Sequence, residues 1–254
     1  MSRLPIRVIA RLDVKNNTVV KGIHLEGLRV VGNPVELAVD YYQQGADEIL
    51  YMDAVASLYE RNSLLPIVKE TAKSVFIPMT VGGGIRTLDN IRDVLHAGAD
   101  KVAINTAAIK RPEFIREASR KYGAQCIVVS IEAKKLGNHW EAYIDTGREA
   151  TGVDAIEWAQ KAVSLGAGEL LITSIDHEGM KRGYDLDLIY DIARKVDVPI
   201  IACGGAGKSQ DLVDVVQKGH ADAVACASLF HYKLANIADV KKDLNQSQIL
   251  VRCA

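Results

Sequence analysis

Short apolar runs alternate with amphipathic stretches along the whole chain. The apolar runs are typical of buried strands and begin near Arg7, Glu48, Phe76, Lys101, Cys126, Glu169, Val198 and Asp222. Between them, apolar residues recur every three or four positions, as in LDNIRDVLHAGAD (88–100) and LDLIYDIARKV (186–196), which is the period of an amphipathic helix. Strands that alternate with helices form parallel sheets. Eight such units in 254 residues predict an α/β fold, a closed (β/α)8 TIM barrel.

The two halves of the chain resemble each other. PVELAVDYYQQGADEIL aligns with the stretch that ends DAIEWAQKAVSLGAGELL, which places Glu48 on Glu169 (169 − 48 = 121). VFIPMTVGGGI aligns with VDVPIIACGGA at the same offset. A constant offset over several strands predicts one barrel domain over 1–254, built from half-barrels at about 1–122 and 123–254. Whatever the first strand presents, the fifth strand is then expected to present again.

Two carboxylates end the first and fifth strands. Asp13 lies in RLDVK and Glu132 in SIEAK, and the repeat places them opposite each other. In (β/α)8 barrels the active site is built at the carboxyl ends of the strands. Facing carboxylates suit general acid and general base catalysis on one substrate. The alternative is that each residue only caps its strand and meets solvent.

Glycine-rich turns follow the third and seventh strands. In the first half, GGG at 82–84 is accompanied by Asn105 and Thr106 after the fourth strand. In the second half, GGAG at 204–207 is accompanied by Ala227 and Ser228 after the eighth strand. Glycine lets backbone N–H groups approach a phosphate closely, and a nearby hydroxyl adds a further donor. A single glycine pair more often marks a tight turn, but two copies at repeat-related positions predict an elongated bisphosphate ligand.

Charged residues also stand where four strands begin, at the opposite end of the barrel. They are Arg7, Glu48, Lys101 and Glu169. Two cations and two anions there can form a ring that closes the barrel floor. Solvated strand ends are the other interpretation.

Arg11 is the unusual residue of the first strand. Strand alternation places one apolar set on the outer face: Val8, Ala10, Leu12 and Val14. The inner face then carries Arg7, Ile9, Arg11 and Asp13. A buried guanidinium without a partner is costly. We therefore predict that Arg11 points into the barrel and pairs with a carboxylate, either Asp13 or Glu132.

Composition narrows the class of protein. Hydrophobic residues make up 48% and charged residues 25%, as in an ordinary globular protein, and the formal net charge of -1 gives no reason to expect nucleic acid or an anionic membrane as a partner. No apolar run approaches the length of a membrane span, so a cytoplasmic protein is expected. The four cysteines and six histidines show no ligand spacing, which predicts buried thiols, no metal and no cofactor.

With these residues in place, the chain resembles the cyclase subunit of imidazole glycerol phosphate synthase over essentially its whole length. The matching stretches are LDVKNNTVVKG, GADEILYMD, FIPMTVGGGIR, GADKVAINTAA, QCIVV, LITSIDHEG, GYDLDL, ACGGAG and ASLFH. The resemblance implies a lyase of histidine biosynthesis. Such an enzyme takes ammonia and a ribulosyl aminoimidazole carboxamide bisphosphate, and forms imidazole glycerol phosphate and an aminoimidazole carboxamide ribotide.

The resemblance also assigns roles to residues. The catalytic pair of the family falls on Asp13 and Glu132, and the lysine of its mobile first loop falls on Lys21. One phosphate site maps to Gly83, Asn105 and Thr106. The remaining substrate and phosphate positions map to Thr173, Glu178, Gly179, Gly204, Gly205, Ala227 and Ser228. The charged set Arg7, Glu48, Lys101 and Glu169 becomes the gate of an ammonia channel, and the N-terminal barrel face is expected to dock on a separate glutamine amidotransferase subunit as a heterodimer.

Three positions depart from the family pattern. Glu132 and Glu178 stand where aspartates are usual, and Arg11 stands where a small cysteine is usual. A carboxylate displaced by about 1 Å can lower a rate by roughly a hundredfold. Two alternatives follow: a paralogue that delivers ammonia with a glutaminase to an amidino-sugar pathway of surface polysaccharide, or a catalytically silent barrel that binds and regulates a glutaminase.

Overall fold

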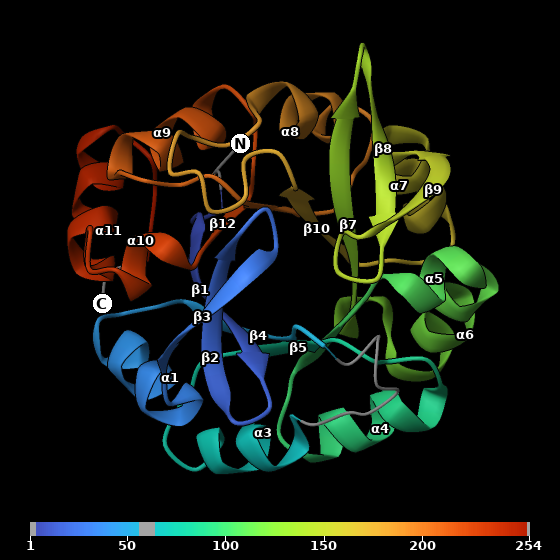
Figure 1. The fold of residues 1–254 in the computed structure, drawn as a ribbon, viewed down its shortest axis with the longest axis horizontal. Helices are drawn as coiled ribbons and strands as arrows, with labels where there is room; N and C mark the ends of the chain where they lie inside the picture. The colour runs from blue at the N-terminus through green and yellow to red at the C-terminus, as the bar shows by residue number, and fades with distance from the viewer. Residues whose placement is uncertain (1–3, 56–63, 253–254) are drawn as a thin grey trace.

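Eight parallel strands close into a barrel in the computed structural model, which describes residues 4–55 and 64–252 (Figure 1). In the order of the barrel wall the strands are β1 (Arg7–Lys15), β4 (Glu48–Asp53), β5 (Met79–Gly82), β6 (Lys101–Ile104), β7 (Ile127–Leu136), β10 (Glu169–Ser174), β11 (Ile200–Cys203) and β12 (Ala223–Cys226). Strand β12 pairs again with β1, with Arg7 beside Ala223. The predicted (β/α)8 barrel is confirmed.

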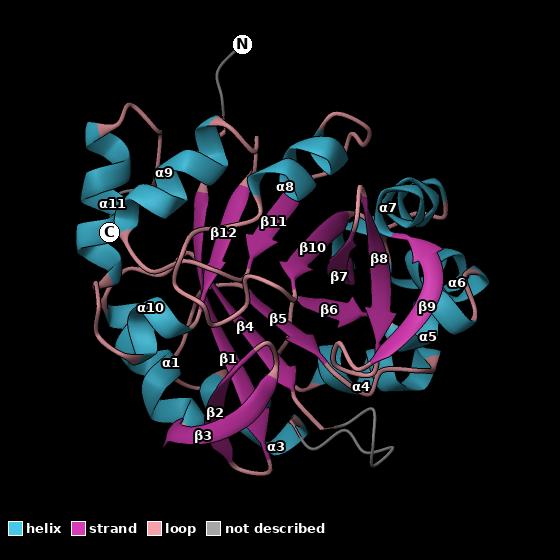
Figure 2. Cartoon of the chain, turned by 45° about the horizontal axis from the view of Figure 1, so that its top comes forward, coloured by secondary structure: helices cyan, strands magenta, loops and turns pink. Residues whose placement is uncertain are grey.

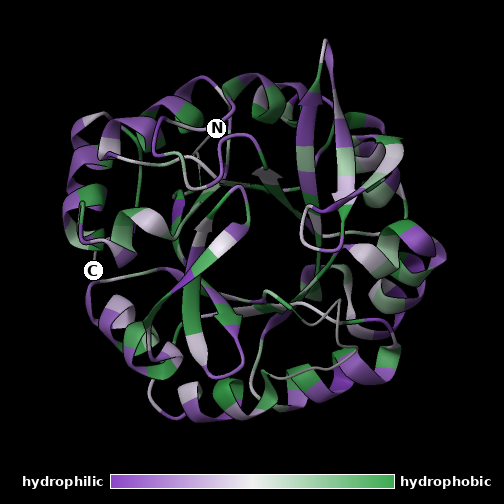
Figure 3. Cartoon of the chain, in the orientation of Figure 1, coloured by the Kyte–Doolittle hydropathy of each residue, from purple (hydrophilic) through white to green (hydrophobic). Residues whose placement is uncertain are grey.

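Helices surround the barrel on its outer side (Figure 2). They are α1 (Pro34–Gln43), α3 (Leu65–Thr71), α4 (Leu88–His96), α5 (Thr106–Lys110), α6 (Glu113–Tyr122), α7 (Ala155–Ser164), α8 (Leu186–Ala193), α9 (Ser209–Gln217), α10 (Ser228–His231) and α11 (Ile237–Gln246), with a short 3-10 turn at Ala124–Cys126. Both hydrophobic and hydrophilic positions lie on each long helix (Figure 3). Such amphipathic helices stabilise the fold by packing their apolar face against the sheet.

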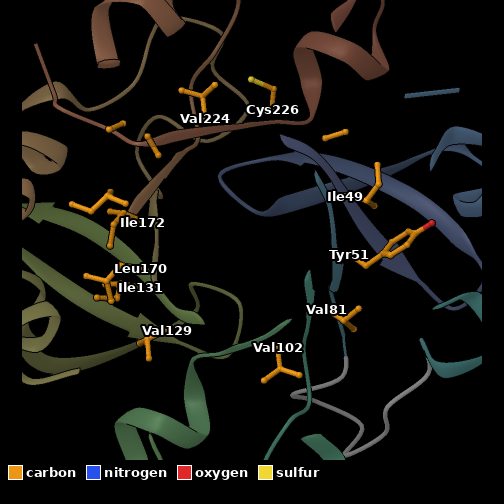
Figure 4. Packing of buried hydrophobic residues seen from close by; sticks show 14 of the residues in the cluster. Ile49, Tyr51, Val81, Val102, Val129, Ile131, Leu170, Ile172, Val224 and Cys226 are labelled. Atoms are coloured by element: carbon orange, nitrogen blue, oxygen red, sulfur yellow. The ribbon is translucent and has the colours of Figure 1, made fainter. Parts of the chain in front are cut away.

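The apolar core forms two layers, one on each side of the barrel wall. Outward-facing strand residues such as Ile49, Tyr51 and Ile172 pack against the helices (Figure 4). Inward-facing residues form a separate cluster that includes Ile9 and Leu50. The alternation predicted for the first strand is therefore confirmed, because consecutive strand residues enter different layers.

Two strands begin later than the hydrophobic pattern predicts. The third barrel strand starts at Met79 and not near Phe76, whose side chain is 75% exposed, and the seventh starts at Ile200 and not at Val198. Pro78 and Pro199 precede these starts. Proline has no N–H group to donate across a sheet, so pairing begins after it. The strand predicted near Phe76 is therefore present, but it begins only at Met79, after Pro78.

A β-hairpin follows the first strand of each half. Strands β2 (Thr18–Ile23) and β3 (Glu26–Gly32) extend β1, and β8 (His139–Ile144) and β9 (Glu149–Asp154) extend β7. Both hairpins lie at the carboxyl end of the barrel, and the first runs in front of the barrel wall in the view of Figure 1.

The cysteines of the described residues are free thiols. Cys203 and Cys226 are buried, as predicted, and Cys126 is half-buried at the end of the 3-10 turn. Cys253 lies outside the described residues. Over 4–55 and 64–252, no helix is both long and apolar enough to cross a membrane.

Candidate active site

A pocket at the carboxyl ends of the strands brings together residues from both halves of the chain. Its wall includes Arg11, Asp13 and Lys21 from the first half and Glu132 from the second. The glycine-rich turn and the fourth strand contribute Gly83, Asn105 and Thr106. The predicted carboxylate pair and one predicted phosphate site therefore share one pocket.

Arg11 lies inside the barrel and is almost fully buried. Its Nε and Nη2 atoms are each 2.9 Å from Oδ1 of Asp13. Its Nη1 atom donates to Thr173 Oγ1 at 3.2 Å and to Cys203 Sγ at 3.1 Å. The prediction that Arg11 is an interior cation paired with a carboxylate is confirmed, and the partner is Asp13.

Asp13 ends the inner face of β1 and is surrounded by cationic groups. Burial by itself raises the pKa of this carboxyl. The Arg11 guanidinium and the Lys21 ammonium together lower the pKa by more than burial raises it, so the pKa of Asp13 lies below its usual value. Asp13 is therefore a carboxylate at neutral pH. Burial lowers the pKa of nearby His231 to about 4, so that imidazole is neutral.

Glu132 has the opposite electrostatic setting. It is buried on β7 and its Oε2 atom accepts a hydrogen bond from Asn105 Nδ2 at 3.1 Å. Burial raises the pKa of Glu132 to about 7, and the more distant Arg11 only partly offsets this. A carboxyl with a pKa close to neutral pH can act as both a proton donor and a proton acceptor.

The first glycine turn has a conformation that requires glycine. Gly83 has φ +101°, and a Cβ atom at this position would lie 2.7 Å from Asp53 Cβ. Beyond the turn, Thr106 begins α5, and its Oγ1 accepts the backbone N–H of Asp145 at 3.1 Å. Backbone thus lines the pocket where the sequence predicted a phosphate site.

The second glycine turn lines a smaller, neighbouring pocket. Its lining includes the predicted residues Glu178, Gly179, Gly204, Gly205, Ala227 and Ser228. Lys21, on β2, forms an ion pair with Glu178. The same hairpin is held down by His24, whose N–H donates to the Glu178 carbonyl at 2.9 Å. Lys21 therefore reaches from one pocket to the carboxylate beside the other.

Four charges close the opposite end of the barrel. Arg7 pairs with Glu48 at 2.9 Å and also with Glu169. Lys101 pairs with Glu48 at 2.9 Å and with Glu169 at 2.8 Å. Thr80 donates a further hydrogen bond to Glu48. The four residues form a ring of alternating charge, so the interpretation of solvated strand ends was wrong.

Some residues of the site were not singled out from the sequence, and one residue predicted at the substrate lies outside both pockets. Arg86, which follows the glycine run by two residues, lines the main pocket. Cys203 Sγ accepts a hydrogen bond from Arg11. A cation two residues after the glycine run was the available signal for Arg86. Thr173, expected at the substrate, lies 1% exposed beneath Arg11 and lines neither of the two pockets described above.

A closed (β/α)8 barrel with charged side chains at the carboxyl ends of its strands has the architecture of TIM-barrel enzymes. Comparison with known sequences gives the particular family. The profile of the family described as "Histidine biosynthesis protein" matches residues 7–236.

Relatives match over nearly the whole chain. A protein of Dehalococcoides mccartyi named "Imidazole glycerol phosphate synthase subunit HisF" is 48% identical over 246 residues, which cover 97% of each chain. A Legionella pneumophila protein of the same name is 56% identical over 207 residues, covering 81% of this chain and 98% of that protein. The chain therefore belongs to the histidine biosynthesis protein family, in the group of imidazole glycerol phosphate synthase HisF subunits.

Proposed function

We propose that this protein is the cyclase subunit of imidazole glycerol phosphate synthase, a lyase of histidine biosynthesis. The observation that carries the proposal is one pocket that holds an ionised Asp13 and a Glu132 whose pKa is close to neutral pH, with two glycine turns beside them. Paired carboxyl groups whose pKa values differ suit acid and base steps on one substrate.

The pockets suggest how the bisphosphate substrate binds. One phosphate would lie against Gly83, Asn105 and Thr106, and the other against the turn of Gly204 and Gly205. The reacting ribulosyl and aminoimidazole groups would then lie over Asp13 and Glu132. The β2–β3 hairpin would cover them, with Lys21 above the site, and so exclude water.

Ammonia would enter from the other end of the barrel. We infer that a separate glutaminase subunit docks on the N-terminal face and releases ammonia at the ring of Arg7, Glu48, Lys101 and Glu169. The ring supports this role because its ion pairs close the barrel floor and must rearrange to open it.

The test separates the cyclase from its partner. The purified protein is incubated with the ribulosyl bisphosphate and a high ammonium concentration, with no glutaminase present. Formation of imidazole glycerol phosphate is expected, and Glu132→Gln is expected to reduce the rate at least a hundredfold. Absence of product under these conditions would refute the cyclase assignment.

One observation favours a second candidate, an ammonia-delivering paralogue of the same subunit. The Arg11 guanidinium fills the barrel interior and binds the carboxylate that the cyclase reaction would use. In this candidate the barrel stimulates a glutaminase and passes ammonia to an enzyme that makes an amidino sugar. Stimulation of the glutaminase without cyclase activity would support it, and no stimulation would exclude ammonia delivery altogether.

A further inference from the structure

Arg11 holds one oxygen of the Asp13 carboxylate with two of its nitrogens. Two of the three guanidinium nitrogens point at a single oxygen, Oδ1 of Asp13, each at 2.9 Å. The third nitrogen is held by Thr173 and Cys203 on the far wall of the barrel. Because Arg11 is anchored on both sides, it cannot follow a substrate into the pocket without breaking several bonds in a buried site.

Glu132 lies opposite and is held much less tightly. Its Oε2 atom accepts a hydrogen bond from the neutral Asn105 amide at 3.1 Å, and the Gly147 backbone N–H donates to the same carboxyl group. In the described part of the chain no cation lies within ion-pair distance of this carboxyl group. Asp13 and Glu132, which line the pocket together with Asp53, are thus not equivalent. Asp13 is bound to a cation, and Glu132 is buried beside neutral N–H groups.

We propose that Arg11 is a positioning residue that keeps Asp13 as a fixed carboxylate and leaves Glu132 as the carboxyl group that exchanges a proton with the substrate. This inference rests on the proposed cyclase function. It assigns the two members of the pair different roles. Asp13 supplies a constant negative charge, and Glu132 is the proton donor and acceptor.

The addition of ammonia illustrates the division. As the lone pair of ammonia forms a bond to the ribulosyl carbonyl carbon, the electron pair of the C=O π bond moves to oxygen. Glu132 gives its proton to that oxygen, which becomes a hydroxyl. The new C–NH3⁺ group then returns a proton to the Glu132 carboxylate. The adduct is neutral and Glu132 regains its starting state, while the Asp13 carboxylate stabilises the passing positive charge on nitrogen.

The charged groups around each carboxyl agree with these roles. Asp13 faces Arg11 on its own strand, Lys21 on β2 and the neutral His231 on α10. Glu132 faces two anions besides Arg11, namely Asp13 across the pocket and the side chain after β8 at Asp145. Neighbouring cations favour the ionised form of Asp13, and neighbouring anions together with burial favour the protonated form of Glu132.

A direct titration of Glu132 tests the proposal without an enzyme assay. The protein is labelled with ¹³C at glutamate side-chain carboxyl groups, and the Glu132 signal is identified by its loss in Glu132→Gln. A titration midpoint near pH 7 is expected, against about 4.3 for an ordinary glutamate. A midpoint in the ordinary range would overturn the proposal. This measurement needs no variant of Arg11, so it stands even if such a variant fails to fold.

The pH dependence of the rate tests the role of Arg11. With free ammonia held constant, the wild-type rate is expected to fall above about pH 7, as Glu132 loses its proton. Arg11→Met removes a cation that favours the ionised form of Glu132, so this falling limb is expected to move up by about one pH unit. Arg11→Lys keeps the charge and should leave the limb close to its wild-type position.

The outcomes distinguish this inference from the function on which it rests. A lower rate in Arg11→Met with an unmoved limb would mean that Arg11 is only structural, and would overturn the proposal. If no variant and not even the wild type forms product, the cyclase function fails. The Glu132 titration, repeated in Arg11→Met, then still decides the division of roles: its midpoint must rise.

Discussion

Arg11 shows how one residue sets the charge balance of the whole pocket. Its side chain is buried among apolar strands, and it is tolerated there because Asp13 lies two residues further along the same inner face. Arg11 helps to hold the pKa of Asp13 below its usual value, and it partly offsets the burial that raises the pKa of Glu132. Three side chains thus form one coupled electrostatic unit.

Removing the cation should destabilise the protein. Arg11→Met leaves Asp13 as a buried carboxylate without its main partner, which is expected to lower the free energy of unfolding by about 3–5 kcal/mol. The double variant Arg11→Met/Asp13→Asn should recover part of this loss. Urea unfolding followed by circular dichroism provides the measurement.

The matched control is an arginine whose ion pairs are exposed. Arg92 pairs with Asp89 and Asp93 on the surface of α4. Exposed pairs of this kind contribute little, so Arg92→Met should change the free energy of unfolding by less than about 1 kcal/mol. An equal loss in both variants would contradict a special role for the buried pair.

Glu132 should make stability depend on pH. Its pKa rises from 4.5 in the unfolded chain to about 7 in the folded protein. Between these values the folded state holds a proton that the unfolded state has lost. This stabilisation is complete below pH 4.5 and disappears as pH rises through 7, a change of about 3 kcal/mol.

The measurement compares unfolding free energies of wild type and Glu132→Gln at pH 5 and pH 8. The variant cannot ionise, so its stability relative to wild type should be higher at pH 8 than at pH 5. Glu149→Gln, at an exposed position of β9, serves as the control and should show no such difference. A pH-independent difference for Glu132→Gln would rule out the raised pKa.

At the scale of elements, the hairpins were the hardest feature to predict. Helix and strand periods predict the barrel units, but β2 and β3 are partly exposed strands with mixed polarity. In the second hairpin, the Trp140 side chain is buried and its Nε1 donates to Asp185 Oδ2 at 2.9 Å, so it packs the hairpin against the barrel units.

Asp185 joins two elements and should be sensitive to substitution. Its Oδ1 atom accepts the backbone N–H of Leu188 as the N-cap of α8, while Oδ2 holds Trp140. Asp185→Ala should cost about 2 kcal/mol in thermal or urea unfolding, because both a cap and a buried hydrogen bond are lost. Asp154→Ala, which removes only the cap of α7, should cost about 1 kcal/mol. Equal costs would show that the Trp140 bond contributes nothing.

At the scale of the molecule, the barrel brings distant residues into one ring. Arg7 and Glu169 are 162 positions apart in sequence and form an ion pair because β1, β4, β6 and β10 begin at the same end of the closed sheet. This arrangement needs the entire barrel, since no single half contains all four charges. It separates the end proposed for ammonia entry from the end with the carboxylates.

Substitution of Lys101 should therefore change the activity with glutamine and the activity with added ammonium to different extents. Lys101→Met opens the ring, and glutamine-dependent product formation with the glutaminase subunit is expected to fall at least tenfold. Activity with added ammonium should remain within about twofold of wild type, because the pocket at the other end is unchanged. Lys242→Met, exposed on α11, is the control and should alter neither rate. Equal losses with both sources would contradict a gate at this ring.

The sequence by itself determined the barrel, the repeat, the inner and outer faces of β1 and most of the pocket residues. These features follow from local periodicity and from the rule that parallel strands end at a common edge. Only the tertiary structure decided which carboxylate holds Arg11, that Lys21 reaches Glu178, and that Thr173 lies below the site. The physical reason is that partner choice and pKa depend on distance and burial, and those are set by packing among strands far apart in sequence.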